Sequence, residues 1–105
     1  MLKDENNNTV ELSRHGIKLD SDENISIISR GGITLDAKAG LEISSDSDVK
    51  IKGLNIDQTA NVDVKVKGTN INQTADVAFA AKGNASAEIS SAAQTTVKGA
   101  LVMIN

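Results

Sequence analysis

Few residues in this 105-residue chain have types and spacing suited to chemistry. The one histidine, His15, could ligate an axial metal if three copies met, since imidazole suits several transition metals. The alternative is a solvated corner histidine, and we predict no metal site. Two carboxylate pairs, Asp20 with Asp22 and Asp46 with Asp48, have the composition of an acid–base dyad. No apolar pocket is evident around them, so solvated turns are favoured.

Other catalytic and ligand-binding motifs are missing. Gly31-Gly32 lacks the Gly-Gly-x-Gly-x-Asp series of calcium-binding repeats, and there is no nucleophile elbow, phosphate loop or cysteine. Charges of both signs are interspersed at a net charge of -3, which gives no basic surface for nucleic acid. No run approaches the roughly 20 apolar residues of a membrane span, and we expect no signal peptide. The sequence therefore predicts no enzyme and no cofactor.

The composition argues against a self-sufficient core. Phe79 is the only aromatic residue, and the other large apolar residues are mainly Ile, Val and Leu. Burying one such side chain contributes roughly 1.5–3 kcal/mol, whereas ordering the backbone costs about 1–2 kcal/mol per residue. Burial shared between several chains is therefore expected.

An eight-residue repeat organises the chain from Ile17 to Ile51. Each unit, or octad, holds two apolar residues separated by one polar residue, such as Lys18 or Glu42. This alternation is typical of a strand with one solvated face. Residues that tolerate tight turns precede each pair, and a bend is predicted at each: Gly16, Asn24, Gly32, Gly40 and Asp48.

Beyond Ile51 the spacing changes. Gly53, Gly68 and Gly83 are fifteen residues apart, and Gly99 follows after sixteen. We interpret this as alternating units of eight and seven residues, in which a bulge or a tightened corner compensates for the missing residue. For the Ala-rich residues 80–93 a helix competes with narrow strands, and strands are preferred because the glycine spacing continues through them.

The predicted fold is all-β: a needle-like, intertwined trimeric triple-stranded β-helix. One turn of a single-chain β-helix has three faces to line, and one octad supplies only two inward side chains, which is too few. Three chains wound together supply one face each. We divide the chain into an irregular or short-strand leading segment (1–16), an octad β-helix (17–53), its fifteen-residue continuation (54–100) and an apolar tip (101–105). The predicted trimer core is Ile17, Leu19, Ile25, Ile27, Ile33, Leu35, Leu41, Ile43, Val49, Ile51, Val62, Val64, Val77 and Phe79.

The octads, the Gly-Ile-x-Leu units and the closing Thr96–Asn105 segment resemble the C-terminal β-helix of VgrG proteins. These are the central spikes of type VI secretion systems and are similar to the spikes of contractile phage tails. The resemblance covers residues 9–105. It implies a homotrimer that is assembled in the bacterial cytoplasm, driven through a target envelope by a contracting sheath, and in only transient contact with the membrane.

The resemblance also implies a PAAR-repeat cone protein bound at the C-terminal end. Leu101, Val102, Met103 and Ile104 form an apolar run before Asn105, and such a patch marks a docking surface. The alternative is that these residues only continue the core. Family members carry a long N-terminal base joined to the tube. It is missing here, so the sequence is either a fragment or a minimal needle, and tube attachment is not carried over.

Two other functions compete with the spike. A trimeric fibre or adhesin shaft would share the octads and the polar exterior, although the apolar closing segment favours a spike. Ice binding would need a flat, regularly spaced array of threonines, and the threonines here do not form one.

Overall fold

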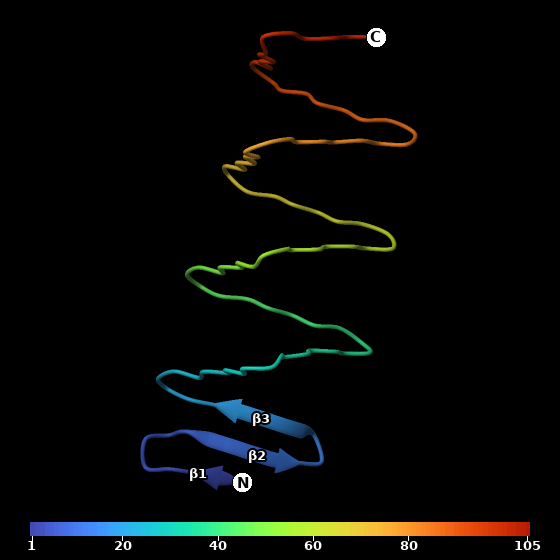
Figure 1. Ribbon diagram of the computed structural model, residues 1–105. Coiled ribbons are helices and arrows are strands. Elements are labelled where there is room, and N and C mark those ends of the chain that lie inside the picture. Colours follow the sequence, from blue (N-terminus) through green and yellow to red (C-terminus); the bar gives the residue numbers. More distant parts are fainter. The chain divides into compact units, whose positions relative to one another are not determined.

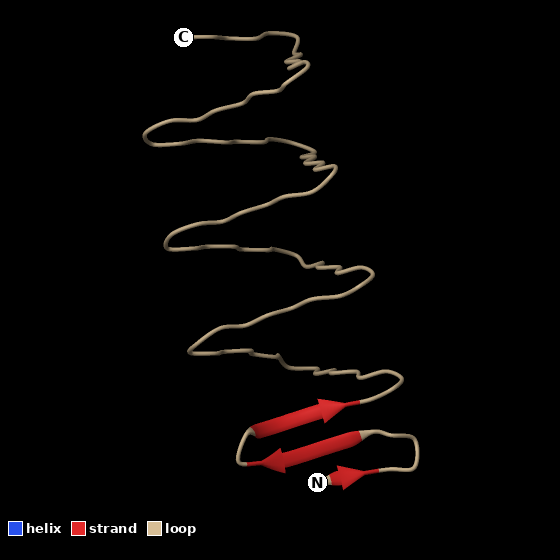
Figure 2. Cartoon of the chain, turned by 180° about the vertical axis from the view of Figure 1, so that it is seen from behind, coloured by secondary structure: helices blue, strands red, loops and turns tan.

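The computed structural model describes residues 1–105 and contains no helix. Its strands are β1 (Leu2–Lys3), β2 (Thr9–Ser13) and β3 (Gly16–Asp20), which form one antiparallel sheet in the order β1-β2-β3 (Figures 1 and 2). The all-β prediction is confirmed, and the competing helix over residues 80–93 does not form. The chain divides into two compact units, Met1–Gly53 (unit 1) and Leu54–Asn105 (unit 2).

The sheet has one apolar and one polar face. Leu2 pairs with Val10 and Val10 pairs with Leu19, so one row of apolar side chains crosses all three strands. Leu12 and Ile17 pair two residues further along and share this face, because successive strand residues alternate between faces. The opposite face carries charged and hydroxyl residues, namely Lys3, Thr9, Glu11, Lys18 and Asp20.

Polar side chains shape the β1–β2 turn. The Asp4 carboxylate accepts hydrogen bonds from the backbone N–H groups of Asn6 and Asn8, each at 2.9 Å, and from the Asn8 side-chain amide. Asn7 has a φ of 66°, a left-handed conformation that asparagine tolerates better than most residues. These local hydrogen bonds favour the turn over an open chain.

The β2–β3 turn is a two-residue connection at Arg14 and His15. Gly16 follows with a φ of 123°, which a side chain would strain. The Ser13 hydroxyl accepts a hydrogen bond from the His15 N–H at 3.1 Å. The glycine before the first octad is thus required by its backbone conformation.

Bends recur every eight residues in the rest of unit 1. Between them the chain runs nearly straight, and each bend changes its direction (Figure 1). Serines support several of them: the hydroxyls of Ser21, Ser29 and Ser45 accept hydrogen bonds from the backbone N–H two residues later. The bends lie at 22–23, 30–31, 38–39 and 46–47.

These bends differ in detail from the predicted ones. They end one residue before Asn24, Gly32, Gly40 and Asp48, which begin the straight segments instead. None of these four residues has a positive φ. The expectation of a turn at those residues was therefore wrong beyond Gly16, and three of the four bends are supported by a serine hydrogen bond without a left-handed residue.

Unit 2 has the same succession of bends and straight segments, but the number of residues from one bend to the next changes. Its bends lie at 54, 61–62, 69, 76–77, 84–85, 92–93 and 100–101. Counted from the first residue of each, the steps are seven, eight, seven, eight, eight and eight residues. Sevens and eights therefore alternate as far as 84, and the octad returns beyond it.

Three glycines of unit 2 stand directly before bends, where a side chain would be crowded at two of them and excluded at Gly83. A Cβ on Gly68 would lie 3.2 Å from the carbonyl oxygen of Asn70, and one on Gly99 would lie 3.1 Å from that of Leu101. A Cβ on Gly83 would collide with the carbonyl oxygen of Ser86. Close approach of the backbone at the bend explains the fifteen- and sixteen-residue glycine spacing.

Candidate assembly surface and tip

Unit 1 carries an apolar stripe made by the same two positions of every straight segment. The first position lies two residues beyond each bend, and its side chains are 53–60% exposed. The second lies two residues further and is 66–70% exposed. By contrast, Ile28 lies outside these positions and is 88% exposed. The stripe consists of Ile25, Ile27, Ile33, Leu35, Leu41, Ile43, Val49 and Ile51.

Unit 2 continues the pattern with different residues from some of those predicted. Val64 and Phe79 occupy the first position, as do Ile56 and Ile71, which are missing from the predicted core. The second position holds Val66 but also two amides, at Gln58 and Gln73. Residues 67–75 nearly repeat residues 52–60. This repeat is the sequence signal that gives Ile56 and Ile71 equivalent positions, and likewise Gln58 and Gln73.

The structure sets Val62 and Val77 apart from the other predicted core residues. Both lie in bends and are 87% and 98% exposed, whereas Val64 and Phe79, two residues on, lie in straight segments. Their membership of a shared core stays a prediction, and their placement favours Ile56, Val66 and Ile71 in that role.

The single chain leaves both its apolar side chains and its backbone without partners. No apolar residue is buried, although Val10 in the sheet is half-buried. Beyond the sheet, even the most covered large side chain, Val102, is 48% exposed. Apart from the sheet, the only backbone–backbone hydrogen bond runs from the Asp4 N–H to the Asn8 carbonyl. Residues 21–105 therefore present a periodic apolar surface together with N–H and C=O groups that have no backbone partner, which is the combination that associates with other strands.

The candidate chemical residues are not assembled into a site. His15 is exposed in the β2–β3 turn, beside Glu11 and Lys18. Asp20 lies 4.0 Å from the Lys18 ammonium, and Asp22 accepts a hydrogen bond from the Asn7 amide. Within one chain no three His, Asp or Glu side chains come close enough to hold a metal. An axial site made by three His15 side chains stays a prediction.

The tip, Leu101–Asn105, differs from the stripe in having four consecutive apolar residues. Leu101 lies in the last bend, and Met103 and Ile104 are 84% and 92% exposed. Because neighbouring side chains of an extended segment point to opposite faces, one apolar pair remains outside when the other turns inward. The tip therefore offers apolar surface beyond what a shared core would take.

No family model, no curated protein and no solved structure matches the chain. No helix in the structure has the length and apolar content to cross a membrane. The function is therefore inferred from the stripe, the bends and the tip.

Proposed function

We propose that the chain is one of three identical strands of an intertwined, needle-like β-helix that serves as a membrane-puncturing spike. The observation that carries the proposal is the state of residues 21–105. They are ordered into bends every seven or eight residues, yet they bury no apolar side chain and make no backbone–backbone hydrogen bond. Chains of the same repeat supply both the missing strand partners and the missing core.

A trimer fits the stripe better than a dimer. Each straight segment has two inward positions on one face, so at any one level along an axis a single chain covers only one side. Three such faces close a core with no free strand edge, which removes the aggregation hazard of unpaired edges. Three chains wound together also unfold slowly, because no strand leaves without unwinding the others.

The outer positions suit passage through a membrane better than residence in it. The residue between the two stripe positions is polar in every octad of unit 1, as at Thr34, Glu42 and Lys50. Such an exterior is too polar for stable contact with lipid. Together with the resemblance to VgrG spikes, this supports mechanical puncture by a contractile injection system, with assembly in the bacterial cytoplasm before ejection.

The tip supports the docking of a PAAR-repeat cone protein. Whichever apolar pair turns inward, three copies of the other pair stay exposed around the end formed by residues 101–105, and an exposed apolar patch of that kind marks a binding site. A shaft that only carries a receptor-binding head gives no role to this second apolar pair. The tip therefore favours the spike over the fibre.

Sedimentation equilibrium of the full chain tests the assembly. We expect a trimer that resists detergent and heat, and a folded monomer would refute the proposal. Docking is tested by capture of a PAAR-repeat protein from the same genome. Met103→Ser with Ile104→Ser should lose capture and remain trimeric, whereas Leu54→Ser, at an exposed bend, should keep it. Undiminished capture by the tip variant would refute docking.

A further inference from the structure

The β1–β3 sheet is the one part of the chain with a hydrogen-bonded structure of its own. Its strands pair through seven matched positions, and its turn is held by the Asp4 carboxylate. Its apolar face is made of Leu2, Val10, Leu12, Ile17 and Leu19, and all of these except the half-buried Val10 are exposed. Leu12 and Ile17 are 67% and 77% exposed.

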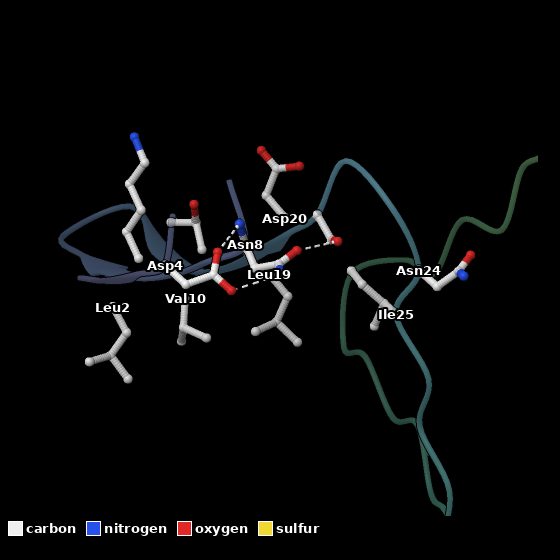
Figure 3. Close-up of a pocket in the computed structure, with 11 residues that line it drawn as sticks. Leu2, Asp4, Asn8, Val10, Leu19, Asp20, Asn24 and Ile25 are labelled. Carbon is white, nitrogen blue, oxygen red and sulfur yellow. Dashed lines mark hydrogen bonds between the residues drawn. The ribbon is translucent and has the colours of Figure 1, made fainter. Parts of the chain in front are cut away.

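This apolar face is continuous with the stripe. Ile17 and Leu19 belong both to the sheet and to the first octad. A hollow of about 430 Å³ is lined by Leu2, Val10 and Leu19 from the sheet and by Ile25 from the stripe. Figure 3 shows Leu2, Val10 and Leu19 pointing to the same side of the sheet, away from Asp20.

Side-chain hydrogen bonds fix the sheet to the first bend. The Asn7 amide donates to the Asp22 carboxylate at 3.0 Å, and the Ser21 hydroxyl donates to the Asn8 side-chain carbonyl. Both contacts join the β1–β2 turn to residues directly before the stripe. The sheet face is thereby held beside the first stripe residues, so a partner that covers one also meets the other.

The stripe of unit 1 alone does not specify how two chains align. Because bends and apolar pairs recur every eight residues in unit 1, a slip of one octad again places apolar side chains against apolar side chains. Strand register is weakly specified when such a shift preserves the pattern. The sheet occurs once and is not repeated, so it has only one matching position on another copy.

We propose that the apolar face of the β1–β3 sheet is a contact surface for the other copies of this chain and that it sets the register in which their stripes meet. This inference rests on the proposed trimer. The occupant is a second copy because the face continues into a stripe whose spacing only a chain with the same repeat matches along its length. The sheet thus makes one alignment the preferred one among several similar ones.

The test measures register directly in the full chain. The sequence has no cysteine, so Ala93→Cys, at an exposed bend of unit 2, gives a single site for a nitroxide label. Pulsed dipolar spectroscopy then measures distances between labels of one assembly. Leu12→Asp and Leu2→Asp each place a charge on the sheet face outside the octads, and Leu54→Asp is the matched control at a bend where the leucine is 99% exposed.

We expect one label–label distance in the parent and in Leu54→Asp, and several in Leu12→Asp and Leu2→Asp while the trimer mass is kept. Leu2→Asp leaves all five β2–β3 pairs intact, so it still tests the face if Leu12→Asp unfolds the hairpin. A single unchanged distance in a trimeric Leu2→Asp would overturn the inference. If the sheet variants became monomeric, the contact would stand and the register role would be refuted. A monomeric parent would instead refute the proposed trimer.

Discussion

Replacing Ile33 by alanine probes the central claim that the stripe is a shared core. Ile33 is 53% exposed in the single chain. Full burial of such a side chain contributes about 1.5–3 kcal/mol, so roughly half of that, about 1 kcal/mol, remains to be gained from partner chains. Three copies then account for about 3 kcal/mol per trimer, which corresponds to a roughly 100-fold weaker association constant for Ile33→Ala.

Sedimentation equilibrium over a range of concentrations measures this constant, and denaturation in guanidinium gives the matching loss of stability. Leu54→Ala is the control, because Leu54 lies in a bend with 99% of its surface exposed. We expect it to change stability by no more than about 0.5 kcal/mol, as surface substitutions usually do. The reasoning is refuted if both variants lose the same stability, or if Ile33→Ala associates as tightly as the parent.

Further substitutions test the bends, the proposed interior and the sheet. Gly83→Ala should lower the melting temperature by several degrees because its Cβ meets the Ser86 carbonyl, whereas Gly40→Ala has open space and should match or exceed the parent; equal melting by circular dichroism would contradict this. Gln58→Ile and Gln73→Ile should each raise the guanidinium midpoint, since an interior amide costs stability, and a lowered midpoint would argue against their inward placement. Hydrogen bonds from Asn8 hold the pKa of Asp4 below its usual range. Their stabilisation is present above the ordinary aspartate pKa of about 3.9 and is lost as the pH falls through the lower folded-state pKa. An acid titration of the sheet signal should therefore show a step that Asp4→Asn lacks.

The repeat made much of the architecture predictable. Apolar residues two apart, recurring every eight residues, require straight segments with one apolar face. Because eight is an even number, the apolar residues of successive segments fall on the same face. This is why the all-β class and the stripe positions of unit 1 follow from the sequence. The same alternation, however, distinguishes residues only by whether they stand at odd or even positions. Val62 and Val64 share parity, and only the placement of the bend at 61–62 separates them.

The N-terminal sheet was the harder part to predict. β1 spans only Leu2–Lys3, too short to show alternation, and residues 4–8 are uniformly polar. The turn depends on one carboxylate that accepts backbone hydrogen bonds from Asn6 and Asn8. Composition reports such polar residues as irregular chain, because it does not record which donor meets which acceptor. Register against β2 was therefore beyond the sequence pattern.

The serine-supported bends also make length a discrete property of this chain. At Ser29 and Ser45 the bend is closed by a hydroxyl and an N–H from residues two apart in the chain, with no atom from a distant segment. A block of eight residues thus carries its own boundary, and its duplication or loss leaves the remaining bends intact. Recombination between such blocks can lengthen or shorten the protein in equal increments. The length of the protein can therefore evolve separately from the sequence of either end.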